Sequence, residues 1–346
     1  VERPNVPKAK TEKHKWAFKA RFRRHAFGWQ SAPAMARIKE ALAEIEKVAK
    51  TNPVLAAVGS IELIERLSPA LERVDSSSGA IGSAVNHAIA ELVPIISSAD
   101  VDAKTRDGWL ERLFAAHEAD DIPYIESLTD HWGELCASKD VASAWADKLI
   151  GITRLALSPD KSLRGHFHGT TACLSTLFYA DRFPELFELL RHETFWPYKH
   201  WEVKALVASG KKSEAIRCAE ACRDPYGGGS LHIDFVCEEI LLSCGMIDEA
   251  YNRYAMRANQ RGTYLATFRA ISKKYPHKLA AEILGDLVKT TPGEEGKWFA
   301  AAKDAGLFEE AIALASSTPC NPMTLAKAAR DFKEKRPAFA VDAGLL

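Results

Sequence analysis

The chain has 346 residues, of which 47% are apolar and 27% are charged, and its 46 Lys and Arg are balanced by 46 Asp and Glu. This composition excludes a disordered or fibrous protein and leaves enough apolar material for a folded core. Only the distribution of charge is unusual: residues 1–25 carry nine Lys or Arg against Glu2 and Glu12, and acids outnumber bases in the rest.

Three features of the sequence bear on its cellular location. No stretch approaches the ~18 consecutive apolar residues that a membrane span requires. The basic N-terminal segment is not followed by the apolar segment of a secretion signal. The seven cysteines are odd in number, and most of them fall within helix-like apolar patterns. We therefore expect a cytoplasmic protein with reduced thiols.

Residues 1–30 are predicted to form a basic aromatic arm. Its cations alternate with aromatic residues, which include Trp16, Phe18 and Phe22. Cations and aromatic rings together suit single-stranded nucleic acid, because the cations neutralise phosphates and the rings stack on bases. The same aromatics also suit a strap that packs on a helical body with its charges in solvent. The candidate binding cations are Lys15, Lys19, Arg21, Arg23 and Arg24.

Residues 31–160 show the apolar spacing of three and four that is typical of amphipathic helices. No run of alternating apolar and polar residues offers material for a sheet. The sequence therefore predicts a helical N-terminal domain over residues 31–160. Its expected helices cover residues 31–50, 54–71, 81–96, 104–117, 122–136 and 141–157.

Residues 161–346 contain a repeat. Five similar segments begin at Asp181, Gly210, Gly245, Tyr275 and Gly306, which are 29, 35, 30 and 31 residues apart. In three of them a glycine can adopt the left-handed conformation that ends a helix, and Glu-Ala follows at the start of the next. The pattern predicts helical hairpins that stack on their neighbours.

This repeat resembles the tetratricopeptide (TPR)-like helical-repeat proteins over residues 165–335. The stretches 75–82, 132–138, 164–170 and 263–269 look more specifically like a family of uncharacterised bacterial α-helical proteins, along most of the chain. The resemblance implies an all-α fold: a helical front half, followed by a TPR-like superhelix of about five hairpins. It implies no particular activity.

A second basic zone lies in the repeats, because no acid occurs between Glu249 and Glu282. If one helix continued through Gly262, three of its arginines would form a ridge. The zone can bind an anionic partner, or acids of neighbouring helices such as Glu238 can neutralise it. The zone also contains Arg269 and Lys278. Its candidate binding residues are Arg253, Arg257, Arg261, Lys273 and Lys274.

Three smaller groups of residues also have alternative interpretations. Arg164, His166 and His168 suit either an acid–base pair with a phosphate clamp or hydrogen bonding at a domain junction. Cys218, Cys222, His232 and Cys237 provide zinc-binding side chains, but their spacing is more typical of core cysteines. Trp196, Tyr198 and Trp201 are candidates for an exposed aromatic patch that binds a partner.

No motif of a known catalytic or nucleotide-binding site is present. We therefore expect a non-enzymatic scaffold or adaptor without metal or cofactor. It is expected to bind a protein or peptide partner in a groove that includes Arg164, His166, His168, Trp196, Tyr198 and Trp201. The alternative is an RNA-binding protein that uses the arm and the basic zone.

Overall fold

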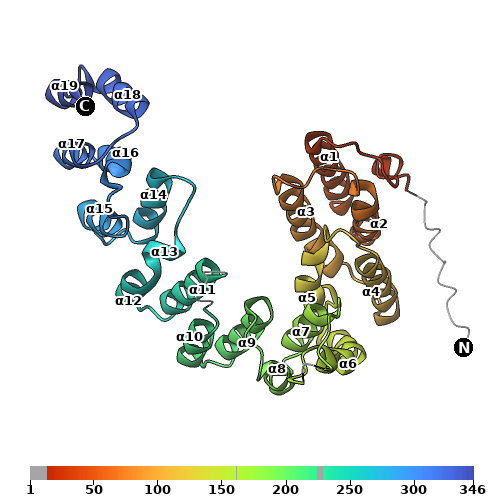
Figure 1. Ribbon diagram of the computed structural model, residues 1–346. Helices are drawn as coiled ribbons and strands as arrows, with labels where there is room; N and C mark the ends of the chain where they lie inside the picture. The colour runs from red at the N-terminus through yellow and green to blue at the C-terminus, as the bar shows by residue number, and fades with distance from the viewer. Residues whose placement is uncertain (1–13, 161, 224–228) are drawn as a thin grey trace, which may run out of the picture. The chain divides into compact units, whose positions relative to one another are not determined.

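The computed structural model describes residues 14–160, 162–223 and 229–346, so the first 13 residues of the predicted arm lie outside it. Every regular element in the described residues is helical (Figure 1), which confirms the predicted all-α class. Contacts divide the chain into two compact units, Val1–Ala205 and Leu206–Leu346. The predicted boundary at residue 160 lies within the first unit, where the helices on either side of it pack against each other.

The first unit contains nine α-helices and two short 3₁₀ segments in its described residues, and the last helix continues three residues beyond the unit. Helices α1, α2 and α3 pack on one another, and α6 packs on α7 (Figure 1). In order, the elements are η1 (Ala17–Ala20), α1 (Ser31–Ala49), α2 (Pro53–Leu71), α3 (Ala80–Ser97), α4 (Ala103–Glu118), η2 (Glu126–His131), α5 (Trp132–Leu135), α6 (Lys139–Ala156), α7 (Thr170–Tyr179), α8 (Phe183–Leu190) and α9 (Trp196–Ala208).

Side-chain caps precede α2 and α4, which begin one residue before the predicted starts at 54 and 104. Asn52 accepts a hydrogen bond from the Leu55 N–H at 3.0 Å, and Asp102 accepts one from the Thr105 N–H at 2.6 Å. Each cap satisfies an amide that has no partner within its helix. The expectation of one helix over residues 122–136 is wrong, because a 3₁₀ segment and a single α-helical turn form there. Pro123 lacks an N–H, and the Asp120 carboxylate takes the Ile125 N–H at 2.7 Å.

The arm from residue 14 onward is docked on the first unit. Trp16, Phe18 and Phe22 are buried within the same core as α1 and α2. The Glu44 carboxylate accepts the Ala17 N–H at 2.8 Å. A Cβ at Gly59 would lie 2.3 Å from the Trp16 ring, so this glycine is what lets the indole reach α2. Apolar packing and a carboxylate cap together fix the arm.

Helix α3 is the one described helix that is long and apolar enough to cross a membrane by length and composition. Seven of its residues, spaced as one helical face, are buried in the core of the first unit: Ile81, Val85, Ala88, Ile89, Leu92, Val93 and Ile96. It also carries His87 and Glu91. Burial of one face against α1 and α2 is what a core helix of a folded domain shows.

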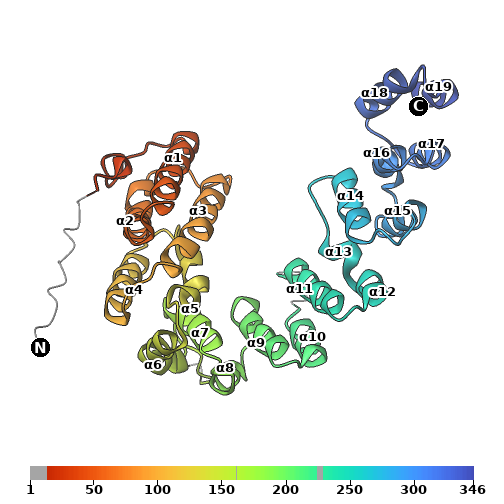
Figure 2. The same ribbon diagram turned by 180° about the vertical axis from the view of Figure 1, so that it is seen from behind.

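The second unit continues as short helices that contact their neighbours along the chain (Figure 2). Its elements are α10 (Lys212–Ala221), α11 (Ser230–Ser243), α12 (Ile247–Ala250), the π-helical turn η3 (Tyr251–Ala255), α13 (Met256–Ala258), α14 (Tyr264–Lys274), α15 (Ala280–Lys289), the 3₁₀ segment η4 (Glu295–Trp298), α16 (Phe299–Asp304), α17 (Phe308–Ser317), α18 (Pro322–Phe332) and α19 (Pro337–Leu345).

Four of the five predicted turns share one backbone geometry. Asp181, Gly210, Gly245 and Gly306 all have a positive φ, between 57° and 78°. In each turn, the residue after the one with positive φ donates its N–H to the carbonyl of the residue five positions before it. An example is the bond from the Lys211 N–H to the Leu206 carbonyl, at 2.8 Å. This is the Schellman pattern, which ends one helix and turns the chain into the next. The fifth turn differs, because Tyr275 keeps a negative φ of −120°.

In the second unit, polar side chains join residues about one repeat apart. The Tyr254 hydroxyl donates to Glu220 at 2.6 Å, and the Tyr251 hydroxyl donates to Asp286 at 2.9 Å. The Arg269 guanidinium bonds both carboxylate oxygens of Asp304, at 2.8 and 2.5 Å. These partners are 34 or 35 residues apart, close to the period of the sequence repeat. Each such bond therefore connects helical segments that lie about one sequence repeat apart.

Candidate functional site

Most candidate cations of the arm are paired with acids of the first unit. The Lys19 ammonium lies 2.5 Å from Glu62, Arg21 pairs with Glu40, and Arg24 lies 3.4 Å from Glu72. Within the described residues, no acid lies within 4.0 Å of the charged groups of Lys15 and Arg23, and both are exposed. The aromatic rings between the cations are largely buried, so Trp16, Phe18 and Phe22 do not present free faces to nucleic-acid bases.

The basic zone of the second unit is largely neutralised by acids of the same unit. Arg253 bonds Glu249 at 2.7 Å and Glu220 at 2.9 Å. The Arg257 guanidinium lies 2.9 Å from the buried carboxylate of Asp234, which also pairs with Arg223. The interpretation in which neighbouring acids pair with these cations therefore describes much of the zone.

Glu238 is the most enclosed acid in this network. Its side chain is fully buried and accepts hydrogen bonds from Lys274 at 2.6 Å, Tyr275 at 2.5 Å and Asn259 at 2.7 Å. Three donors on one buried carboxylate offset part of the cost of removing it from water. Glu238 thereby joins α11 to α14, one hairpin further along the chain.

The expected arginine ridge does not form, because the helix ends at Ala258 and α14 begins after the Thr263 cap. The Thr263 hydroxyl accepts the Ala266 N–H at 3.1 Å. Arg261 therefore lies in the exposed connection, where its guanidinium bonds the Gln260 carbonyl at 3.2 Å. Arg261 and Lys273 have no acid within ion-pair distance among the described residues.

The histidine loop between α6 and α7 brings its candidates close together. The rings of His166 and His168 are 4.6 Å apart between centroids, and both residues are exposed. The buried His117 places its Nε2 atom 3.1 Å from the His168 carbonyl oxygen. Arg164 lies 2.5 Å from the buried Glu193 carboxylate, which also accepts the N–H groups of Thr194 and Phe195. Arg164 thus helps to hold the segment that starts α9.

The tryptophans expected in a partner groove are buried in the structure. Trp196 and Trp201 are only 7% and 2% exposed, and Tyr198 is half-buried. Trp201 packs on Phe178 with 5.7 Å between ring centroids, while the Lys204 ammonium lies 4.1 Å from the Trp201 ring centroid. The expectation of an exposed aromatic patch from Trp196 and Trp201 is therefore wrong. Phe195, which the sequence analysis did not select, is the exposed ring of this segment, at 54%.

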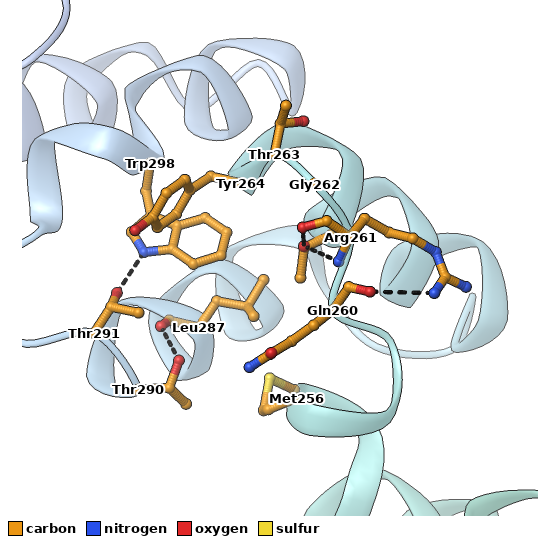
Figure 3. A pocket seen from close by; sticks show the side chains of 11 residues that line it. Met256, Gln260, Arg261, Gly262, Thr263, Tyr264, Leu287, Thr290, Thr291 and Trp298 are labelled. Carbon is orange, nitrogen blue, oxygen red and sulfur yellow. Dashed lines mark hydrogen bonds between the residues drawn. The ribbon is translucent and has the colours of Figure 1, made fainter. Parts of the chain in front are cut away.

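A pocket of about 250 Å³ lies within the second unit, between the end of α13, the start of α14, the end of α15 and η4 (Figure 3). Its inner wall includes Met256, Leu287 and the indole of Trp298. Gly262 and seven residues with polar side chains complete the lining: Gln260, Arg261, Thr263, Tyr264, Thr267, Thr290 and Thr291. It follows directly on the π-helical turn η3, a distortion that often marks functional sites.

Hydrogen bonds fix most polar groups of this pocket. The Trp298 indole N–H donates to the Thr291 hydroxyl at 2.7 Å, and the Thr290 hydroxyl donates to the Leu287 carbonyl at 2.7 Å. The Tyr264 hydroxyl bonds the Glu294 carboxylate, which raises the pKa of this phenol. Tyr264 and Trp298 also pack edge to face, with ring centroids 4.7 Å apart. The aromatic wall is therefore held in one arrangement.

The cysteines differ in their exposure. Cys136, Cys173 and Cys237 are buried, and burial raises their thiol pKa values to about 12, 11 and 11. Cys244 is exposed. Among the residues that the structure describes, no group of three or more His, Cys, Asp or Glu side chains is arranged to hold a metal ion.

Of the residues that line the pocket, only Arg261 is a candidate from the sequence, and it was selected for its charge. Its inner wall combines Met256, Leu287 and Trp298 from three separate segments, and the apolar periodicity of each segment does not show that together they leave a cavity. One signal was available: Thr263, Tyr264 and Thr267 lie in the stretch 263–269, on which the resemblance to bacterial helical proteins partly rests.

Comparison with known proteins found no family model and no curated protein that matches the chain.

Proposed function

We propose that the chain is a non-enzymatic, cytoplasmic helical-repeat scaffold of TPR-like type that binds a protein partner through its second unit. The repeated Schellman turns and the polar bonds between successive hairpins support a stacked array. Proteins built in this way present side chains from several repeats along one surface, and such surfaces commonly bind partner segments.

The pocket between α13, α14, α15 and η4 is the observation that carries this proposal. Its lining comes from α13, α14, α15 and η4, so successive helical segments contribute to it, as they do to the binding surfaces of repeat proteins. Its rim residues Gln260, Arg261 and Thr263 are exposed, while Leu287 and Trp298 of the inner wall are buried. An accessible rim around an apolar wall resembles the anatomy of protein-binding hot spots.

Two findings support a protein partner over RNA. Within the basic zone, Arg253, Arg257 and Lys274 bond acids of the same unit, so fewer cations are free to neutralise phosphates. In the described part of the arm, Trp16 and Phe18 are packed into the core and do not offer faces for base stacking. RNA binding remains the alternative outcome of the experiment below.

Affinity capture with the full chain as bait tests this proposal. We expect a protein that is retained after nuclease treatment, is lost when Met256→Trp fills the pocket, and is kept by the control Lys327→Trp. Lys327 is exposed on α18 and does not line the pocket. Capture of nucleic acid alone, or of proteins that nuclease releases, would contradict the proposal and favour the RNA-binding alternative.

A further inference from the structure

The size of the pocket in the second unit limits what it can hold. Small-molecule and cofactor sites typically enclose ~300–1,000 Å³. The pocket measures about 250 Å³, slightly below that range. Its volume therefore suits one large side chain, or a group of that size, better than a whole nucleotide or cofactor.

The wall of the pocket is chemically suited to an aromatic ring. Figure 3 shows the Trp298 indole and the Tyr264 ring on one side, with the Met256 thioether below the opening between them and Gln260. The two rings are almost perpendicular, at 84°, and the Trp298 N–H is already bonded to Thr291. A third ring can pack against these rings and against the sulfur, two kinds of contact that favour aromatic over aliphatic groups of equal area.

The charges around the pocket favour a neutral group. Arg261 is the one charged side chain among the described lining residues, and Figure 3 shows its guanidinium pointing away from the pocket. The nearby Glu294 carboxylate is occupied, because it bonds Tyr264 and lies 2.5 Å from Lys297. A buried charge without a partner is costly, so an ionised side chain would be disfavoured here.

We propose that this pocket is the receptor for an uncharged aromatic side chain, such as that of phenylalanine, on a peptide segment of the partner. This inference rests on the proposed protein-binding function and specifies which residue class the site takes. The Gln260 side-chain amide has no hydrogen-bond partner among the described residues and lies at the rim. It is placed to bond the main chain of the bound segment, which would orient the ring toward Trp298.

The test measures binding of single-residue probes to the full chain by ligand-observed NMR. N-acetyl-phenylalanine amide is the main probe, and N-acetyl-leucine amide tests for aromatic preference. The α-amide of N-acetyl-glutamate, whose only charge is on its side chain, tests for neutrality. Aromatic contacts add enough to predict that the phenylalanine probe binds about three- to tenfold more tightly than the leucine probe. The charged probe should show at least tenfold weaker binding than the phenylalanine probe.

Two variants assign that binding to the pocket. Met256→Trp fills the pocket from its inner wall, and Gln260→Trp covers it from an exposed position whose replacement should not disturb the fold. Both should abolish binding of the phenylalanine probe, and the control Lys327→Trp should retain it. Equal binding of the leucine probe, unchanged binding in Gln260→Trp, or no binding of the phenylalanine probe at millimolar concentration would each overturn the inference.

Failure of the inference differs from failure of the proposed function. If the affinity capture yields a nuclease-resistant protein that depends on the pocket, while the leucine probe matches the phenylalanine probe, the function stands and the aromatic specificity is wrong. If the phenylalanine probe binds but only nucleic acid is captured, the pocket is an aromatic site and the scaffold proposal is wrong.

Discussion

Glu238 offers a direct test of how neighbouring hairpins are joined in the second unit. Its neighbour Glu239 bonds the same lysine, Lys274, also at 2.6 Å. The two acids differ in their surroundings: the Glu238 side chain is fully buried and has two further donors, whereas the Glu239 side chain is 49% exposed. Substituting each by glutamine removes the same charge from the same helix in two different environments.

The loss of unfolding free energy expected for each variant follows from the burial of the carboxylate that it replaces. Hydrogen bonds to a buried charged group contribute ~1.5–3 kcal/mol each, and breaking a buried ion pair costs ~3–5 kcal/mol. Because glutamine retains one acceptor oxygen, we expect Glu238→Gln to destabilise the second unit by ~3 kcal/mol. An exposed ion pair is worth ~0–1 kcal/mol, so Glu239→Gln should cost less than ~1 kcal/mol.

Urea unfolding followed by circular dichroism measures both variants. With a slope of ~2 kcal/mol per molar urea, the midpoint of the second unit should fall by ~1.5 M in Glu238→Gln and by less than ~0.5 M in Glu239→Gln. Hydrogen exchange of peptides from α11 and α14 locates the loss, because Glu238 lies on α11 and accepts a hydrogen bond from Lys274 of α14. Equal shifts in the two variants, or faster exchange confined to the first unit, would refute this account of the buried carboxylate.

Three further predictions concern the arm, the turns and the thiols. Gly59→Ala should displace Trp16, destabilise the first unit by ~1–3 kcal/mol and speed proteolysis near residue 16. The control Gly82→Ala should have none of these effects, because its Cβ would have no atom within 4 Å. Resistance of Gly59→Ala to the protease would count against a docked arm. Gly245→Ala should lower the free energy of unfolding by ~1 kcal/mol, because the φ of Gly245 is +73°. Gly285→Ala in α15 should leave stability unchanged or raise it. Melting temperatures that fall equally in the two variants would contradict the assignment of the turn at Gly245. At pH 8, iodoacetamide should label Cys244 but leave Cys136, Cys173 and Cys237 unmodified until the chain unfolds. Burial raises the pKa of these three thiols and so lowers their thiolate fraction. Mass spectrometry that finds Cys136 labelled as fast as Cys244 would contradict the burial of Cys136.

Local signals in the sequence predict much of the helical structure. The glycines at 210, 245 and 306 identify turns that the structure shows with positive φ, because few residues other than glycine adopt that conformation easily. Apolar spacing also locates most helices of the first unit. It fails at residues 122–136, where Pro123 and the Asp120 side chain alter the local hydrogen bonds.

The candidate site was less predictable because it depends on pairs of residues from different hairpins. The sequence shows that the zone from Arg253 to Lys278 is basic and offers Glu238 as an acid that can neutralise it. It does not show that Asp234 also pairs with this zone from α11, because that depends on how the helices pack. Spacing suggests that Trp196 and Trp201 can lie on a surface, but their burial depends on how α9 packs against α7. The pocket beside Trp298 arises from the same kind of tertiary arrangement and has no local sequence pattern.

Photo-crosslinking in living cells tests the central claim most directly. A benzophenone amino acid in place of Thr263, at the exposed rim of the pocket, should yield a crosslinked species that protease digests and nuclease leaves intact. The same group in place of Lys327 should not give that species. Crosslinks from position 263 that nuclease removes, or identical products from both positions, would contradict a protein-binding site at this pocket.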